Sequence, residues 1–398
     1  MKTDGDRAMK IVSVMTTSSS GGAEFAAVAL LEALSERGHQ TVMVSDQPQI
    51  TEGSSVRAQA IDIGPKLASD TYLGLLLRFP LLLVQLRRAL ERESPYDVLL
   101  VHYKKEQLLA ALLPRRLRST LVWAEWGPIP FQMRRGLPRR IYVWASRRAA
   151  LIMAISAGTQ RSVAAVGVDE GKIVVVPNAL RTESIRYSPE GRRRMRELHG
   201  IPAEAFVVGC VSRFHPKKRN DVVIDAVLGL EDDNVHLIMG GDGETEQMLR
   251  ERAAPLGERA HFTRTPREEI ADVLSCFDVM VFCPSPTEGA PRAIILGMLA
   301  QRPCLSGGAE GVDDLIEPEF GAIASPEHDP TALRALIARY IGDPQRIERE
   351  GAVARRRAEE VYAAPVVAER VEELLTAAGA GGSRLSCTAP RNSPQPQQ

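Results

Sequence analysis

The chain has 398 residues, which is too long for one ordinary hydrophobic core and predicts two domains. Its 50 basic and 50 acidic side chains balance, so the composition excludes a general attraction to nucleic acid. The five cysteines lie far apart without metal-ligand spacing, and we interpret them as reduced core residues in a reducing compartment, with no structural metal.

The first half of the chain has the pattern of a doubly wound parallel sheet. Residues 10–14 predict a strand, residues 18–22 a glycine loop and residues 24–37 a helix that ends at Gly38. Further strands are predicted over residues 41–45, 98–102, 121–124, 151–155 and 173–176. Helical patterns separate most of these strands, as a parallel sheet requires.

Membrane segments are not expected from the sequence. The polar first residues predict no signal peptide. Residues 72–90 are the most apolar stretch, but Arg78 and Pro80 interrupt them, and no uninterrupted span reaches the about 20 residues of a crossing helix. We expect a pair of core-packing helices there, with contact to a membrane surface as the alternative.

The α/β pattern begins again after a polar, basic linker in the first part of residues 181–204. Strands are predicted over residues 206–211, 235–239, 261–262 and 279–282. Helices are predicted near residues 219–230, 245–254, 267–277, 291–300, 330–341 and 346–377.

We therefore expect two Rossmann-like α/β domains that face a central cleft. The N-terminal domain would comprise residues 1–183 and the C-terminal domain residues 184–358. A C-terminal helix over residues 359–378 would cross back to the first domain. Gly, Ser, Pro and Gln dominate residues 379–398, which predicts a disordered tail.

Two cations follow the predicted strand over residues 206–211. Arg213 and Lys218 stand at its carboxyl end, where α/β sheets bind ligands. Their charge suits a diphosphate leaving group, because negative charge grows there as a sugar departs. A solvated basic turn is the alternative.

A carboxylate and a helix N-terminus follow the predicted strand over residues 279–282. Glu288 and Gly289 lie in the loop, and a helix begins soon after Ala290. The first N–H groups of a helix suit phosphate, and a carboxylate suits sugar hydroxyls. This pairing predicts a nucleotide-sugar site, with a helix-capping acid as the alternative reading of Glu288.

Weaker candidates lie at other strand ends. Gly21 and Gly22 follow the first strand, where glycine permits positive φ and close approach to a ligand, with a loop that serves the turn only as the alternative. Gly241 lies in the turn after the strand over residues 235–239, with a simple loop and an N-cap acid as the alternative. In the first half, His102 could orient or polarise a hydroxyl. An acceptor could bind at Glu125 and Trp126. A histidine with no chemical role and ordinary loop packing are the alternatives.

Arginines concentrate between residues 134 and 148 of the first half. They are Arg134, Arg135, Arg139, Arg140, Arg147 and Arg148. Few aromatics accompany them and the chain has no positive excess, so a solvated face is favoured over a nucleic-acid patch. Contact with an anionic membrane surface is the minor alternative.

In their order, these motifs resemble the retaining GT-B glycosyltransferases of family 4, also called glycosyltransferase group 1, over about residues 9–375. The resemblance is carried by residues 10–14 with 21–24, 154–159, 174–179, 212–218 and 287–291. It implies an enzyme of the hexosyltransferase type. Such an enzyme moves a sugar from a nucleoside diphosphate donor, most commonly a UDP-sugar, to a hydroxyl in polysaccharide, glycolipid or natural-product biosynthesis.

The resemblance also implies roles for individual residues. Arg213 and Lys218 would hold the donor diphosphate, and Glu288 would meet hydroxyls of the donor sugar. The segment of Gly289, Ala290, Pro291 and Arg292 would seat the sugar and phosphate through the amides of residues 290–292. Gly21, Gly22 and Gly241 would complete the donor site. As a looser match, His102 would lie near the reacting sugar.

The resemblance further implies that the nucleotide sugar is a co-substrate and that neither cofactor nor metal is required. The enzyme would act in the cytoplasm, with peripheral attachment to the inner membrane face as an option. Two departures stand out. Leu296 occupies the place of the second signature glutamate, and Glu125-Trp126 replace a histidine that many relatives carry. The first departure keeps open a degenerate protein that binds nucleotide or glycan without catalysis.

Overall fold

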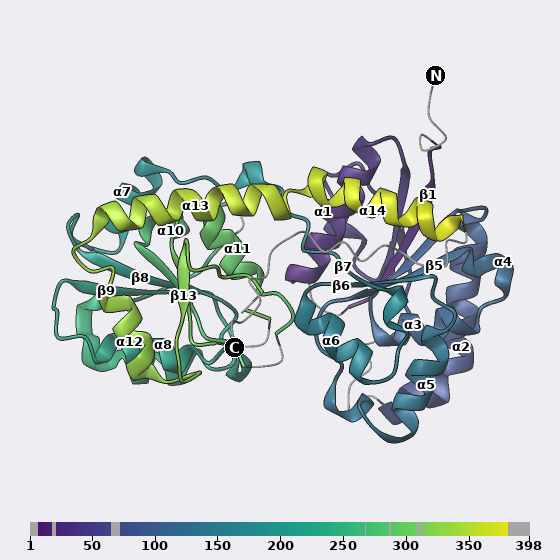
Figure 1. The fold of residues 1–398 in the computed structure, drawn as a ribbon, viewed down its shortest axis with the longest axis horizontal. Helices are drawn as coiled ribbons and strands as arrows, with labels where there is room; N and C mark the ends of the chain where they lie inside the picture. The colour runs from purple at the N-terminus through teal and green to yellow at the C-terminus, as the bar shows by residue number, and fades with distance from the viewer. Residues whose placement is uncertain are drawn as a thin grey trace. The chain divides into compact units, whose positions relative to one another are not determined.

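The computed structural model describes residues 7–17, 21–64, 72–266, 268–285, 288–308, 311–312 and 314–380, with only the backbone described for residues 72–77. The chain forms two compact units (Figure 1). Unit 1 comprises Met1–Leu180 with Ala364–Gln398, and unit 2 comprises Arg181–Ala363. The units thus divide a few residues away from the expected positions 183 and 358, and the expected cleft between them stays a prediction.

Unit 1 is built on a parallel sheet of seven strands within the described residues. They are β1 (Lys10–Met15), β2 (Gln40–Ser45), β3 (Arg57–Ala60), β4 (Val98–Val101), β5 (Thr120–Glu125), β6 (Leu151–Ala154) and β7 (Ile173–Val175). The strand order is β3-β2-β1-β4-β5-β6-β7. The order reverses between β1 and β4, and in such sheets the crevice at the reversal, outside the carboxyl ends of the strands, is the usual ligand site.

Helices cover both faces of this sheet. They are α1 (Gly22–Glu36), α2 (Tyr72–Glu93), α3 (Lys104–Leu112), α4 (Arg115–Arg118), α5 (Gly136–Ser146), α6 (Ala157–Ala165) and α14 (Ala364–Gly379), with short 3-10 turns η1 (Pro48–Thr51), η2 (Phe131–Met133) and η3 (Glu170–Lys172). Along β4, Leu99 and Val101 pack with α2, α3 and α5, whereas Val98 and Leu100 pack with α1 and α14. This alternation is what a doubly wound sheet requires.

Unit 2 repeats the architecture with six described strands. They are β8 (Phe206–Val211), β9 (Val235–Gly240), β10 (Ala260–Thr263), β11 (Val279–Phe282), β12 (Cys304–Ser306) and β13 (Gly321–Ile323), in the order β10-β9-β8-β11-β12-β13. Its helices are α7 (Pro189–Leu198), α8 (Asn220–Leu228), α9 (Glu246–Ala253), α10 (Ile270–Cys276), α11 (Arg292–Leu299), α12 (Pro330–Ala338) and α13 (Pro344–Tyr362), with η4 (Thr182–Ser184), η5 (Pro216–Lys218) and η6 (Ala254–Arg259). Here the order reverses between β8 and β11.

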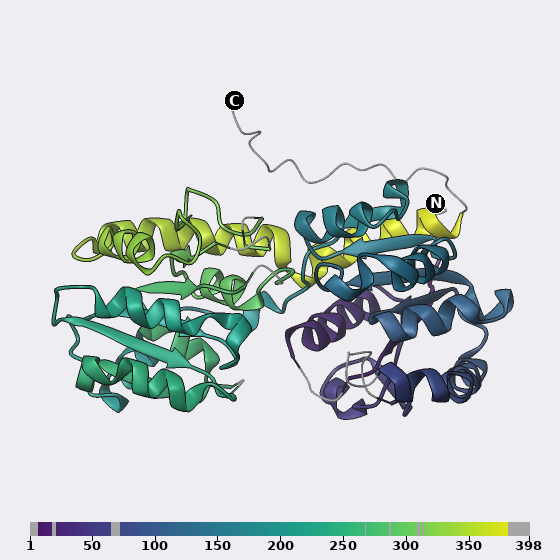
Figure 2. The same ribbon diagram turned by 90° about the horizontal axis from the view of Figure 1, so that it is seen from below.

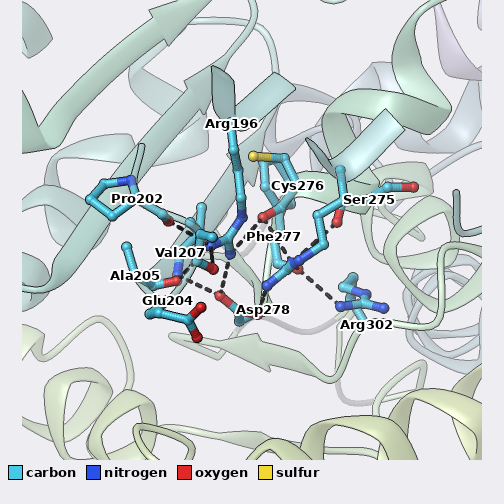
Figure 3. Close-up of polar contacts among 12 residues, drawn as sticks. Arg196, Pro202, Glu204, Ala205, Val207, Ser275, Cys276, Phe277, Asp278 and Arg302 are labelled. Carbon is cyan, nitrogen blue, oxygen red and sulfur yellow. Dashed lines mark hydrogen bonds and ion pairs between the residues drawn. The ribbon is translucent and has the colours of Figure 1, made fainter. Parts of the chain in front are cut away.

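A buried aspartate ties α7 to the amino edge of this second sheet (Figure 3). Asp278 accepts hydrogen bonds from Arg192 Nη2 at 2.6 Å and from Arg196 Nη2 at 2.9 Å. It also accepts from the Val207 amide at 2.7 Å, and Arg302 donates to the neighbouring Phe277 carbonyl at 3.0 Å. These contacts hold the amino ends of β8 and β11 in place. They thereby also fix where the carboxyl ends of the two strands lie.

The predicted C-terminal helix is interrupted. Helix α13 ends at Tyr362, Ala363 is extended, and α14 begins at Ala364. Pro365 explains the break, because a proline cannot donate the hydrogen bond that a continuous helix needs at that position. Helix α14 packs on α1 in unit 1, as Figures 1 and 2 show in yellow against purple. Residues 381–398 of the predicted tail lie outside the described residues.

The apolar stretch over residues 72–90 and three short strands differ from the sequence predictions. Residues 72–93 form one helix, α2, with Pro80 inside it, rather than a pair of helices. No helix of the described residues is long and apolar enough to cross a membrane. The short strands β3, β12 and β13 were not predicted, because they have three or four residues each and β3 lacks an apolar pattern.

Candidate functional site

The β8–α8 loop of unit 2 carries the two predicted phosphate-binding cations. The Ser212 amide donates to the Gly240 carbonyl at 2.9 Å, and Phe214 is buried beneath the loop. Arg213, between these two anchors, is exposed and has no ion-pair partner in the described part of the chain. A guanidinium held on a fixed loop without a carboxylate is available to an anionic ligand.

Gly241 supports this loop from the next strand. Its φ is +141°, and a Cβ atom there would overlap the Ser212 carbonyl oxygen. Gly243, with φ of +148°, stands against the Phe214 carbonyl in the same way, and the Phe214 amide donates to the Asp242 carbonyl at 2.6 Å. The structure therefore gives Gly241 a positioning role for the Arg213 loop, whereas direct contact with the donor stays a prediction.

Lys218 and Glu288 meet at the reversal between β8 and β11. Lys218 Nζ lies 2.6 Å from Glu288 Oε1, and the side chains are 23% and 21% exposed. The ammonium also lies 5.3 Å from the centre of the Phe282 ring. Two residues that are 70 positions apart in the sequence thus form one charged pair at the edge where ligands of α/β sheets bind.

Backbone contacts fix the segment around Glu288. The Ser285 amide donates to the Lys217 carbonyl at 2.7 Å, which links this loop to the β8–α8 loop. His328 Nε2 donates to the Pro284 carbonyl at 2.7 Å. Gly311 lies so close to the carbonyl oxygens of Glu288 and Gly289 that a Cβ atom would not fit. No local pattern in the sequence predicts these long-range contacts.

Helix α11 begins directly behind Glu288. Pro291 is its N-cap residue and Arg292 is its first residue. Proline has no N–H, so within residues 290–292 only Ala290 and Arg292 have the amides that we expected to seat the sugar and phosphate. Leu296 lies on the second turn of α11 and is partly buried.

The glycine turn of unit 1 is organised by an acid that the sequence analysis did not single out. Gly21 is the N-cap of α1, and its amide donates to Glu24 Oε2 at 2.9 Å. The Tyr103 hydroxyl donates to the other oxygen of Glu24, which is 5% exposed. A glutamate three positions after an N-cap is the available sequence signal. Neither glycine uses the positive φ that the residue type permits, because the φ of Gly21 is −149° and Gly22 is the first residue of α1.

His102 follows β4 and has both ring nitrogens engaged within unit 1. Trp126 Nε1 donates to its Nδ1 at 3.2 Å, so the ring proton resides on Nε2, which donates to the Ser13 hydroxyl at 2.7 Å. Burial lowers the pKa of His102 to about 3, and the ring is therefore neutral near pH 7. This arrangement orients Trp126, and the role of His102 in chemistry stays a prediction.

Glu125 lies in a buried polar network. It accepts hydrogen bonds from the Tyr142 hydroxyl at 2.7 Å, from Gln107 Nε2 at 2.9 Å and from the Lys104 ammonium. The carboxylate is 3% exposed, and burial lowers the pKa of Lys104. These contacts give Glu125 a structural role that accounts for its position, and acceptor binding by Glu125 or Trp126 stays a prediction. Trp126 and His102 also line a small cavity of about 30 Å³.

The described residues contain no group of three or more His, Cys, Asp or Glu side chains that could hold a metal ion. Four of the cysteines, Cys210, Cys276, Cys283 and Cys304, are buried free thiols. Cys387 lies outside the described residues.

Two sequence families match the two units in turn. Residues 20–184 match the model described as Glycosyltransferase Family 4, and residues 205–343 match the model described as Glycosyl transferases group 1. The chain belongs to glycosyltransferase family 4, group 1. The two matched segments contain the glycine turn of unit 1 and the Arg213, Lys218 and Glu288 site of unit 2.

Individual relatives of this chain are moderately similar to it. It is 28% identical over 209 residues to the 2-deoxystreptamine glucosyltransferase of Streptomyces kanamyceticus, across 50% of this chain and 54% of that protein. It is 25% identical over 387 residues to a D-inositol 3-phosphate glycosyltransferase of Kineococcus radiotolerans, across 86% and 87% of the two chains. The chain thus spans about half the length of the first relative and most of the second.

Solved structures establish the fold. The Anabaena protein Alr3699/HepE in complex with UDP has a TM-score of 0.79, with 21% identity, 93% of this chain and 100% of that chain covered. A sucrose-phosphate synthase from Thermosynechococcus elongatus has a TM-score of 0.77, with 16% identity, 94% and 100% covered. The expected fold class is confirmed: the chain consists of two Rossmann-like α/β units of the GT-B type.

Proposed function

We propose that this chain transfers a hexose from a nucleoside diphosphate sugar to an acceptor hydroxyl, with retention at the anomeric carbon. The observation that supports the proposal most directly is the Lys218–Glu288 pair at the sheet reversal of unit 2, with the exposed Arg213 on the adjoining loop. Unit 2 would bind the donor and unit 1 the acceptor.

The charges of the site suit the departure of a diphosphate. The bond from the anomeric carbon to the β-phosphate oxygen breaks, and a bond to the acceptor oxygen forms on the same face. The acceptor proton passes to the departing phosphate. Arg213, Lys218 and the first amides of α11 would stabilise the negative charge that develops, so we propose that no metal ion is needed.

Donor binding would separate the Lys218–Glu288 pair. Partly exposed ion pairs contribute about 0–1 kcal/mol, whereas hydrogen bonds to charged groups contribute about 1.5–3 kcal/mol. A donor that offers phosphate oxygens to Lys218 and sugar hydroxyls to Glu288 replaces one weak interaction by several stronger ones. The pair therefore balances the charge of Lys218 before the donor binds, without opposing donor binding.

We propose UDP as the nucleotide, and the UDP in the similar Anabaena structure supports this choice. Relatives named for 2-deoxystreptamine and for D-inositol 3-phosphate differ in their acceptors, so the acceptor is proposed only as a hydroxyl of a polysaccharide, glycolipid or natural product. The free thiols in unit 2 support a reducing, cytoplasmic location, with peripheral attachment to the inner membrane face as part of the proposal.

Leu296 favours a second candidate function, which is binding of nucleotide or glycan without transfer. An apolar side chain there removes a carboxylate that would bond a hydroxyl, and such a bond contributes on the order of 0.5–3 kcal/mol. Release of diphosphate from a panel of UDP- and GDP-sugars with hydroxyl acceptors decides between the two functions. Tight binding without turnover across the panel would favour the second.

Three substitutions test the proposed donor site. Arg213→Ala and Lys218→Ala should each weaken the binding of free UDP at least about tenfold in calorimetry, because each removes a charge-assisted contact. Glu288→Gln should leave UDP binding unchanged or tighter, because it releases Lys218, and should slow transfer about a hundredfold if the carboxylate binds the sugar.

Lys217→Ala is the matched control, since Lys217 is an exposed neighbour in η5. It should bind UDP like the parent protein. Equal losses for Lys217→Ala and Lys218→Ala would show a diffuse charge effect and would remove Lys218 from the site.

A further inference from the structure

One surface of unit 1 has charge of a single sign. Residues 127–168 contain seven arginines and neither aspartate nor glutamate, although the whole chain has equal numbers of basic and acidic residues. Five of these arginines, at positions 134, 135, 139, 140 and 147, are exposed on η2, α5 and their flanks. Within the described residues, none of the five pairs with a carboxylate.

The same surface exposes large apolar side chains. Phe131 of η2 is 76% exposed and Leu137 of α5 is 65% exposed. Ile141 and Trp144, at 37% and 38%, continue from Leu137 at helical spacing, so the three form one outward stripe along α5. The opposite face of α5 is already used, because Tyr142 and Ala145 pack in the core with α3. The packing of α5 into the core therefore does not account for the exposed apolar stripe.

Arginines flank the stripe in fixed positions. Arg139 Nε donates to the Val166 carbonyl at 2.7 Å, and Arg148 lies over the Trp144 ring at 3.8 Å. A shallow hollow of about 250 Å³ opens among Arg139, Arg140, Val143, Trp144 and Arg147. A hollow with three guanidinium groups and an indole has room for a phosphate headgroup and its first carbons.

We propose that η2 and α5, residues 131–147, bind an anionic lipid bilayer. Phe131, Leu137 and Trp144 enter the boundary between headgroups and acyl chains, and the arginines meet lipid phosphates. The positive charge of this surface favours an anionic bilayer over other partners. A second copy of this chain would bring the same arginines face to face, and a neutral bilayer would leave them without counterions. The inference rests on the peripheral attachment proposed above and assigns it to a defined surface, which contains no residue of the donor site.

The full chain can be tested with vesicles in co-sedimentation. It should bind vesicles that contain phosphatidylglycerol, bind less at high salt, and stay in solution with phosphatidylcholine alone. Each arginine near an anionic surface contributes about a fivefold gain in partition, so Arg139→Glu, Arg140→Glu and Arg147→Glu together should lower the partition at least about a hundredfold.

A second triple variant is the control. Arg339→Glu, Arg349→Glu and Arg356→Glu change the net charge by the same amount at exposed positions of unit 2, and should keep binding within about twofold. Both triple variants should unfold in urea as cooperatively as the parent protein when tryptophan fluorescence is followed, which shows that unit 1 folds, because all three tryptophans lie in unit 1. Leu137→Ser should weaken binding without any change of charge.

Trp144 supplies an independent signal. Its emission should shift to shorter wavelength with phosphatidylglycerol vesicles, and Trp144→Phe should abolish the shift while binding persists. Absence of binding by the parent protein, equal loss in both triple variants, or preference for duplex DNA or RNA over the vesicles would overturn the proposal. None of these outcomes bears on sugar transfer, which is measured separately by diphosphate release.

Discussion

His102 shows how burial limits the chemistry of a residue at a strand end. Its position after β4 was predicted, but its partners Ser13 and Trp126 lie 89 and 24 positions away and were not. Both nitrogens serve hydrogen bonds within unit 1, and burial lowers the pKa of the ring to about 3. A reaction that used His102 as an acid or base would first have to release one of these partners.

The lowered pKa predicts a pH dependence of stability. The unfolded chain takes up a proton on His102 below about pH 6.5, but the folded chain does not until about pH 3. The stability from a neutral His102 is therefore complete above about pH 6.5 and is lost as the pH falls toward 3. The loss is about 1.4 kcal/mol per pH unit, or about 2 kcal/mol between pH 7 and 5.

Urea unfolding followed by tryptophan fluorescence measures this loss, because Trp123, Trp126 and Trp144 are the three tryptophans of the chain and all lie in unit 1. His102→Gln should be less stable than the parent at pH 7, and its free energy of unfolding should fall by about 2 kcal/mol less between pH 7 and 5. An unchanged pH dependence would mean that His102 is already charged or exposed in the folded protein.

The loops that follow β8 and β9 in unit 2 pack against each other and together position Arg213. Gly241 and Gly243 allow the second loop to lie against the carbonyl groups of the first, which holds Arg213 between Ser212 and Phe214. Gly241→Ala should therefore destabilise unit 2 by about 2–4 kcal/mol and weaken UDP binding about tenfold or more. Thermal unfolding and calorimetry measure the two effects.

Gly257→Ala is the matched control for this loop. Gly257 also has positive φ, at +58°, but no atom lies near the place of an added Cβ atom. Gly257→Ala should lower the free energy of unfolding of unit 2 by about 1 kcal/mol and leave UDP binding unchanged. If Gly241→Ala were equally mild, the loops would be able to separate and Arg213 would not depend on Gly241.

The sequence predicted most of the buried strands, because runs such as Val279–Phe282 are apolar without interruption. It also predicted that Arg213, Lys218 and Glu288 lie at one edge, since parallel strands share their carboxyl ends. It did not predict the direct Lys218–Glu288 contact, the Tyr103–Glu24 bond or the Asp278 cluster. Each depends on which strands become neighbours, and local pattern does not contain that information.

Helix α14 makes unit 1 discontinuous in the chain. Ala364, Val367, Ala368, Val371, Leu374 and Leu375 are buried in the core that α1 also covers. A chain that ends at residue 363 should therefore expose this core, and each large residue contributes about 1.5–3 kcal/mol of burial. We expect unit 1 of this shortened chain to unfold or aggregate, as read from tryptophan fluorescence and the dye ANS.

A chain that ends at residue 380 is the control, because it keeps α14 and removes only residues 381–398. It should melt like the full chain. Unit 2 should keep its UDP affinity in both shortened chains, since its core contains no residue of α14. A stable unit 1 without α14 would show that β4 and its neighbours need no cover on that face.

The return of α14 also sets an order for folding on the ribosome. Residues 181–363 separate the first part of unit 1 from its last helix. At about 5–20 residues per second, their synthesis takes on the order of 10–40 s. During that interval the apolar face of the unit 1 sheet that α14 later covers stays exposed, while unit 2 can already fold. We therefore expect the later part of the chain to mature first, with chaperones occupying the place that α14 finally takes.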